Sequence, residues 1–100
     1  MNNEIEKLLD LWQRREGISG IYILPTSTSK NIDILLCLED ERLSYFERLD
    51  FYYPPSWRKD FLHVYPISRQ EFKNWPEKIK EQVRKTIEKS RILWQKEPCW

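Results

Sequence analysis

The stretch SKNIDILLCLED, residues 29–40, constrains the fold more than any other part of the chain. Its residues 34–38 are all apolar, which is typical of a strand that is covered on both faces. Asn31 and Asp33 precede this run two positions apart, and side chains at that spacing on a strand point to the same face. Two interpretations are open. The two polar residues either mark the solvent-exposed start of a strand, or they belong to a metal site that is intact or partly lost.

The helices are predicted from apolar periodicity and capping signals. Apolar residues at positions 5, 8, 9 and 12 share one helix face, which predicts a helix over residues 3–16. Ser68 and Glu71 have the spacing of a capping box, which predicts a short helix that runs to residue 74. Pro76 suits the first position of a last helix, whose apolar stripe is Ile79, Val83 and Ile87.

Short runs rich in β-branched and aromatic residues predict the strands. These runs are residues 21–24, 31–38, 49–53 and 61–67, and residues 91–94 form either a final turn or a last short strand. The polar segment at residues 39–49 reads as a loop or a short helix. The resulting order predicts the α/β class: a small mixed β-sheet with helices packed on it.

Length and composition limit the possible functions. A chain of 100 residues predicts one domain, residues 1–100. The formal net charge is +1, so overall charge gives no reason to expect nucleic-acid binding. No apolar run approaches the roughly 20 residues of a membrane-spanning helix, and the polar start of the chain does not look like a signal peptide. We therefore expect a cytoplasmic protein.

Two cysteines make neither a disulfide framework nor a zinc site, and Cys37 is expected to be a small buried hydrophobic residue.

Three stretches together carry a family resemblance. The segments GIYIL and NIDILLCLED look like a first strand pair, FLHVYPISRQEF like a later strand and turn, and PEKIKEQVRKTIEKSRILW like a terminal helix and its end. In this order they resemble the minimal nucleotidyltransferases of the polymerase-beta-like superfamily. The resemblance implies one minimal nucleotidyltransferase-like domain. It also implies transfer of a nucleotidyl group from ATP by two Mg²⁺ ions about 3.5–4 Å apart.

The chain departs from the pattern of that family at the positions that would bind metal. The family has Asp-x-Asp on the second strand, where this chain has Asn31 and Asp33. The slot of the third carboxylate falls at His63, or at Asp50 if residues 49–53 are the matching strand. Mg²⁺ prefers carboxylate oxygens, and here only Asp33 is a secure ligand. The resemblance therefore implies a degenerate member, a pseudoenzyme with weak metal binding at most.

Further candidate residues have both a functional and an ordinary structural interpretation. Ser27, Ser29 and Lys30 could hold a phosphate, but the loop PTSTSK lacks the glycines of the family's Gly-Ser loop and is equally typical of a solvated loop. Trp57 and Trp100 are candidates for a subunit or partner interface. The basic last helix, from Lys78 on, is either a solvated outer face or an RNA contact.

We therefore expect a partner-binding module whose catalytic motif has decayed, with no cofactor. The partner would be another protein or a second copy of the chain. The resemblance implies a helical HEPN-like protein, in a toxin–antitoxin arrangement. The alternatives are a weakly active Mg²⁺-dependent nucleotidyltransferase that uses ATP, with Asp33 as the main ligand, and an RNA-binding module.

Overall fold

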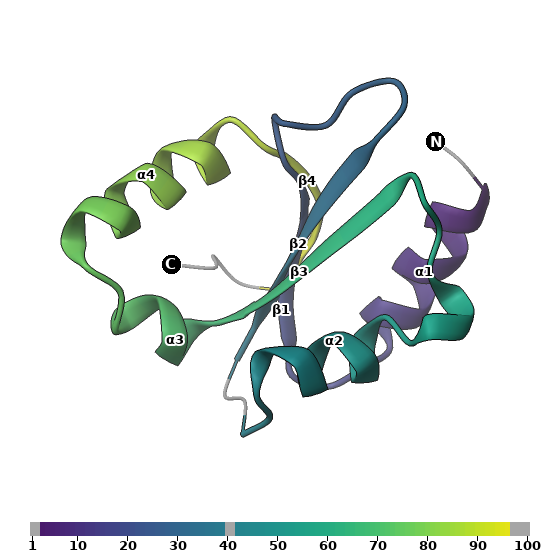
Figure 1. The fold of residues 1–100 in the computed structure, drawn as a ribbon, viewed down its shortest axis with the longest axis horizontal. Helices are drawn as coiled ribbons and strands as arrows, with labels where there is room; N and C mark the ends of the chain where they lie inside the picture. Colours follow the sequence, from purple (N-terminus) through teal and green to yellow (C-terminus); the bar gives the residue numbers. More distant parts are fainter. Residues whose placement is uncertain (1–2, 40–41, 97–100) are drawn as a thin grey trace.

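The computed structural model describes residues 3–39 and 42–96. It shows a twisted sheet with helices on both of its faces (Figure 1). In chain order the elements are α1 (Asn3–Gln13), β1 (Ile18–Ile23), β2 (Ile32–Leu38), α2 (Tyr45–Tyr52), the 3₁₀ turn η1 (Pro55–Trp57), β3 (Leu62–Ser68), α3 (Arg69–Lys73), α4 (Glu77–Glu88) and β4 (Arg91–Gln95).

The sheet has the strand order β3-β2-β1-β4 and is mixed. β2 pairs in parallel with β3, while β1 runs antiparallel to both β2 and β4. The expected α/β class with a small mixed sheet is thus confirmed. β2 lies inside the sheet with a neighbour on each side, which explains its unbroken apolar run.

Side chains of β2 alternate between two buried layers. Ile34, Leu36 and Leu38 face α1 and α2 and belong to the larger core cluster. Leu35 and Cys37 point to the opposite face, where Ile87 of α4 packs against them. The two layers explain why α1 and α2 lie on one side of the sheet and α4 on the other (Figure 1). Within the described ranges, no helix is both long and apolar enough to cross a membrane.

The predicted strand at residues 49–53 is wrong, because most of this segment is the second half of α2. Ser44 starts the helix with a full capping box: its Oγ accepts from the Glu47 backbone N–H at 3.4 Å, and the Glu47 carboxylate accepts from the Ser44 N–H at 3.3 Å. The helix then buries Tyr52 against the core. Local capping and burial therefore outweigh the β propensity of the aromatic residues.

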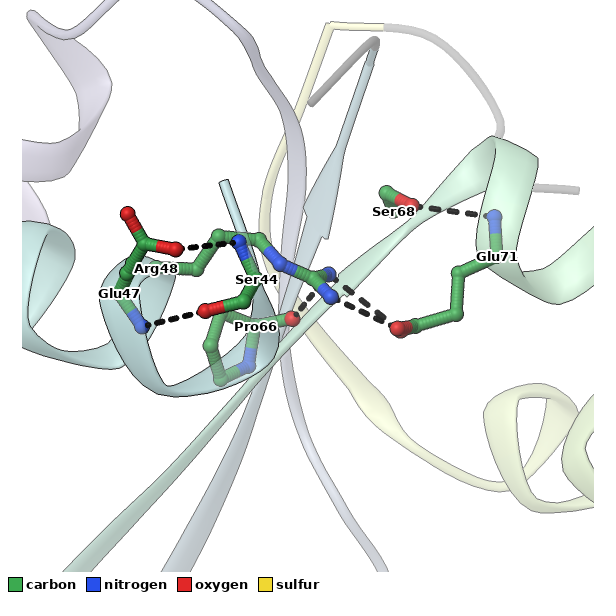
Figure 2. Close-up of polar contacts among 6 residues, drawn as sticks. All are labelled: Ser44, Glu47, Arg48, Pro66, Ser68 and Glu71. Carbon is green, nitrogen blue, oxygen red and sulfur yellow. Dashed lines mark hydrogen bonds and ion pairs between the residues drawn. The ribbon is translucent and has the colours of Figure 1, made fainter. Parts of the chain in front are cut away.

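A buried ion pair connects α2 to α3 across β3 (Figure 2). The Arg48 side chain is only 5% exposed, and its Nη2 lies 2.7 Å from Oε2 of Glu71. Its Nη1 donates to the Pro66 carbonyl at 2.9 Å and to Oε1 of Glu71 at 3.3 Å. One half of the predicted capping box forms, since Ser68 Oγ accepts from the Glu71 N–H at 3.0 Å. The Glu71 carboxylate, which would form the other half, binds Arg48 instead.

Cys37 is fully buried, as expected, but it is disulfide-bonded and is therefore not a simple hydrophobic residue. The expectation failed because the formation of a disulfide depends on the tertiary fold and has no signature in the spacing of cysteines along the chain. Cys99, the other cysteine of the chain, lies outside the described residues.

Candidate functional site

The candidate site begins in the tight loop that joins β1 to β2. Its backbone is held by hydrogen bonds from Ser27 N to the Leu24 carbonyl at 3.0 Å and from Thr28 N to the Asn31 carbonyl at 2.7 Å. The Thr28 hydroxyl accepts from the backbone N–H groups of Lys30 and Asn31. Hydroxyl side chains, which suit turns, thus satisfy the backbone of a loop that contains no glycine.

Asp33, on β2, is bound by the hydroxyl residues of this loop. Thr26 Oγ1 donates to Asp33 Oδ2 at 2.6 Å. The Ser27 hydroxyl accepts from the Asp33 N–H at 2.9 Å and donates to the Asp33 carbonyl at 3.3 Å. The loop therefore binds one carboxylate oxygen and the backbone of Asp33. Ser27, a predicted phosphate ligand, uses its hydroxyl to bind the Asp33 backbone.

The parallel register sets His63 of β3 directly beside Asp33. Paired residues of neighbouring strands project to the same face of a sheet, so the imidazole and the carboxylate share one face. This is the face that bears Leu35 and α4. His63 is exposed, and Asp33 is half-buried. The position expected for a third carboxylate on β3 thus carries an imidazole next to the single carboxylate of β2.

The other predicted site residues lie apart from this pair or at its margin. Asp50 is on α2, which covers the opposite face of the sheet, and its carboxylate pairs with Arg58 at 2.7 Å. Because Asp50 is helical, the alternative that made it a strand ligand beside Asp33 is wrong. Asn31, Ser29 and Lys30 are exposed, and Asn31 lies one residue before β2 begins.

The chemistry available at this site is limited. Of the described residues, no three side chains of His, Cys, Asp or Glu are grouped so that they could hold a metal ion. Mg²⁺ requires hard oxygen ligands, and Asp33 supplies one carboxylate while Asn31 supplies at best an amide oxygen. An imidazole such as that of His63 suits transition metals better than Mg²⁺. The arrangement could weakly bind one cation brought in by a ligand.

Comparison with solved structures matches the architecture to a known fold. The crystal structure of a candidate nucleotidyltransferase from Sulfolobus solfataricus superimposes with a TM-score of 0.58 over 98% of this chain and 83% of that chain. The chain has a nucleotidyltransferase-like fold. At 12% sequence identity, this likeness shows the fold and nothing of the activity. No family model matches the sequence, and no curated protein matches it.

In this nucleotidyltransferase-like fold, an apolar groove lies between α4 and the face of the sheet that bears Asp33. It has a volume of about 330 Å³. Its lining includes Leu35, which is two residues along β2 from Asp33, together with Trp75, Val83 and Ile87. The sequence did not reveal this groove, because the stripe of α4 predicts contact with the sheet but not how closely the helix packs.

A second surface surrounds Trp57, one of the two predicted interface residues. Trp57 ends η1, is half-buried, and packs against the larger core cluster. The Tyr53 hydroxyl donates to the Leu62 carbonyl at 3.2 Å and accepts from the Lys59 backbone N–H at 2.7 Å, which holds the turn in place. Burial raises the pKa of the Tyr53 phenol, so it stays neutral and able to donate. Trp100, the other predicted interface residue, lies outside the described residues.

Proposed function

We propose that this chain is a binding module built on the nucleotidyltransferase-like fold and that it does not carry out two-metal nucleotidyl transfer. The observation that supports this most directly is the set of side chains at the site. Asp33 is paired with His63 on β3, and Asn31 lies two positions before it. Of the three positions at which the family has carboxylates, one therefore has an amide and one an imidazole. We propose that no resident cofactor is bound.

The electrostatics of two-metal catalysis explain the importance of these two positions. Two Mg²⁺ ions bring four positive charges, which the intact family triad offsets with about three negative charges before the substrate binds. Each charge–charge contact at a few ångströms contributes about 4 kcal/mol at an intermediate dielectric constant. Here Asp33 alone remains, and Thr26 already donates to one of its oxygens at 2.6 Å. The second metal would have no carboxylate of its own.

The weakly active, Mg²⁺-dependent enzyme is the alternative that the structure favours next. Its support is the adjacency of Asp33 and His63 on one face of the sheet, close to an apolar groove. The RNA-binding alternative has less support, because lysines of α4 are matched by acids on the same helix. Lys80 lies 3.3 Å from Glu77 and Lys85 lies 3.6 Å from Glu81.

For the partner, we propose another protein or a second copy of this chain. The family resemblance makes a helical HEPN-like protein, in a toxin–antitoxin arrangement, the first partner to test. Two exposed aromatic side chains of α2 are accessible to such a partner, since Phe46 is 77% exposed and Phe51 is 51% exposed.

A label-transfer assay tests the proposed function. The chain is incubated with ATP labelled at the α-phosphate, with Mg²⁺ and with a HEPN-like protein as acceptor. We expect no transfer above that of the Asp33→Ala variant, because a single carboxylate does not hold two metal ions. Transfer by the unmodified chain that disappears in Asp33→Ala would establish the enzyme and overturn the proposal.

A further inference from the structure

The two edges of the sheet differ in whether another strand could be added to them. At the β3 edge, Pro66 has no backbone N–H, and its carbonyl accepts from Arg48 Nη1 at 2.9 Å. The Leu62 carbonyl of the same strand accepts from the Tyr53 hydroxyl at 3.2 Å. Proline and covering side chains are usual protections of an edge strand. β4, at the other edge, contains no proline.

The outer side of β4 presents backbone groups that no described strand pairs with. Directly after β4, the Lys96 N–H donates to the Ser19 carbonyl at 2.9 Å, so the backbone of Lys96 faces inward. Along an antiparallel strand, the backbone groups of successive residues face opposite sides, so those of Gln95 face outward. The partners of Gln95 and Ile92 lie two positions apart on β1, which gives Ile92 the same outward orientation.

The side chains along this edge combine apolar surface with positive charge. Ile92 is 55% exposed, and Arg91 and Lys89 are exposed beside it in the chain. Within residues 3–39 and 42–96, neither of these two cations forms an ion pair. Lys96 differs from them, since its Nζ lies 3.5 Å from Oε1 of Glu39. The start of β4 therefore has two cations that are available to a carboxylate from outside.

The same charges argue against pairing between two copies of this chain. In an antiparallel pair that uses both outward residues, Ile92 of one chain lies opposite Gln95 of the other. This register places Arg91 of each chain opposite Lys96 of the other, and like charges directly opposite each other are destabilising. A strand with a carboxylate at that position is complementary instead.

We propose that the outer edge of β4 binds an extended segment of a partner protein as an additional strand. Backbone hydrogen bonds to Ile92 and Gln95 hold the segment, while an acidic side chain beside Arg91 and an apolar side chain beside Ile92 select it. Since neighbouring side chains of a strand point to opposite faces, this segment alternates acidic and apolar residues. The inference rests on the proposed binding function and specifies the surface and the chemistry of the partner.

A selection from a displayed library of random peptides, made against the full chain, tests this inference. We expect enrichment of peptides in which acidic and apolar residues alternate. The best peptide is then made with N-methyl groups on one or the other alternate set of its residues. One set removes the N–H groups that face β4 and should weaken binding at least about tenfold, whereas the other set should leave it nearly unchanged.

The charge of the edge is tested with the same peptide. It should bind the Arg91→Glu variant at least about tenfold more weakly than the unmodified chain, because attraction becomes repulsion. The control is Lys78→Glu, which makes the same charge change at an exposed position of α4. We expect this control to bind as the unmodified chain does.

Four outcomes would overturn the inference. They are a selection without acidic peptides, equal weakening by the two N-methylated sets, equal binding to the two charge-reversed variants, and a dimer of the chain in sedimentation that the peptide dissociates. The label-transfer assay is independent of these outcomes. A transfer-active chain that still selects such peptides refutes only the proposed function, and an inactive chain that selects none refutes only the inference.

Discussion

Replacing Arg48 with alanine is expected to lower the free energy of unfolding by about 3 kcal/mol. The Arg48 side chain is 5% exposed and binds both the Glu71 carboxylate and the Pro66 carbonyl. Its removal leaves a largely buried carboxylate without its charge partner and loosens the contact between α2, β3 and α3 (Figure 2). Urea denaturation followed by circular dichroism measures the change.

The matched control for Arg48→Ala is Arg14→Ala, which removes one partner of an exposed ion pair on α1. Arg14 lies 3.1 Å from Asp10, but the two side chains are 74% and 60% exposed. Arg14→Ala should change the free energy of unfolding by no more than about 0.5 kcal/mol, because exposed ion pairs contribute little. Equal effects of the two substitutions would contradict the view that the Arg48–Glu71 pair is a buried connection.

Replacing Trp12 with alanine is expected to lower the free energy of unfolding by about 4 kcal/mol. Trp12 is fully buried in the larger core cluster, and its Nε1 donates to the Tyr52 carbonyl at 2.8 Å. The residue therefore fills the core and also ties α1 to the end of α2. A free energy of unfolding of about 5–15 kcal/mol is usual for a domain, so this variant should be close to unfolding.

Two further variants separate the contributions of Trp12. Trp12→Phe retains most of the apolar volume and loses the hydrogen bond, so it should lower the free energy of unfolding by about 1–2 kcal/mol. Leu11→Ala alters the neighbouring, 39% exposed position of the same helix and should have a smaller effect than Trp12→Ala. If Trp12→Ala were no more destabilising than Leu11→Ala, the assignment of Trp12 to the core would be wrong.

Much of the fold could be predicted because its signals are local. The helical periodicity around Trp12, the apolar run of β2 and the Ser68 cap each depend on residues within a few positions of one another. Residues 91–94, left open between a turn and a strand, lie in β4 at an edge of the sheet. The wrong prediction of a strand at residues 49–53 has a local cause too. The Ser44–Glu47 capping box starts a helix that continues through this β-rich segment to Tyr52.

The features that matter most for function are not local. Asp33 and His63 become neighbours only through the parallel register of β2 and β3, and their separation in sequence does not specify that pairing. The contact between Arg48 and Glu71 likewise joins two helices through the tertiary fold. The Arg15 guanidinium comes within 5.8 Å of the centre of the Trp57 ring only in the tertiary fold, so the sequence identified the tryptophan but not its cationic neighbour.

The most direct test of the central claim is a calorimetric Mg²⁺ titration of the unmodified chain and of the Asn31→Asp, His63→Asp variant. We expect no saturable binding to the unmodified chain, and binding strengthened at least about tenfold in the variant, because Asp33 then has a carboxylate beside it on β3 and another two positions before it in the chain. Gln13→Asp, Gln70→Asp, which adds two carboxylates at exposed positions elsewhere, should bind no better than the unmodified chain. Saturable Mg²⁺ binding to the unmodified chain that Asp33→Ala abolishes would contradict the account, as would a variant that gains no affinity.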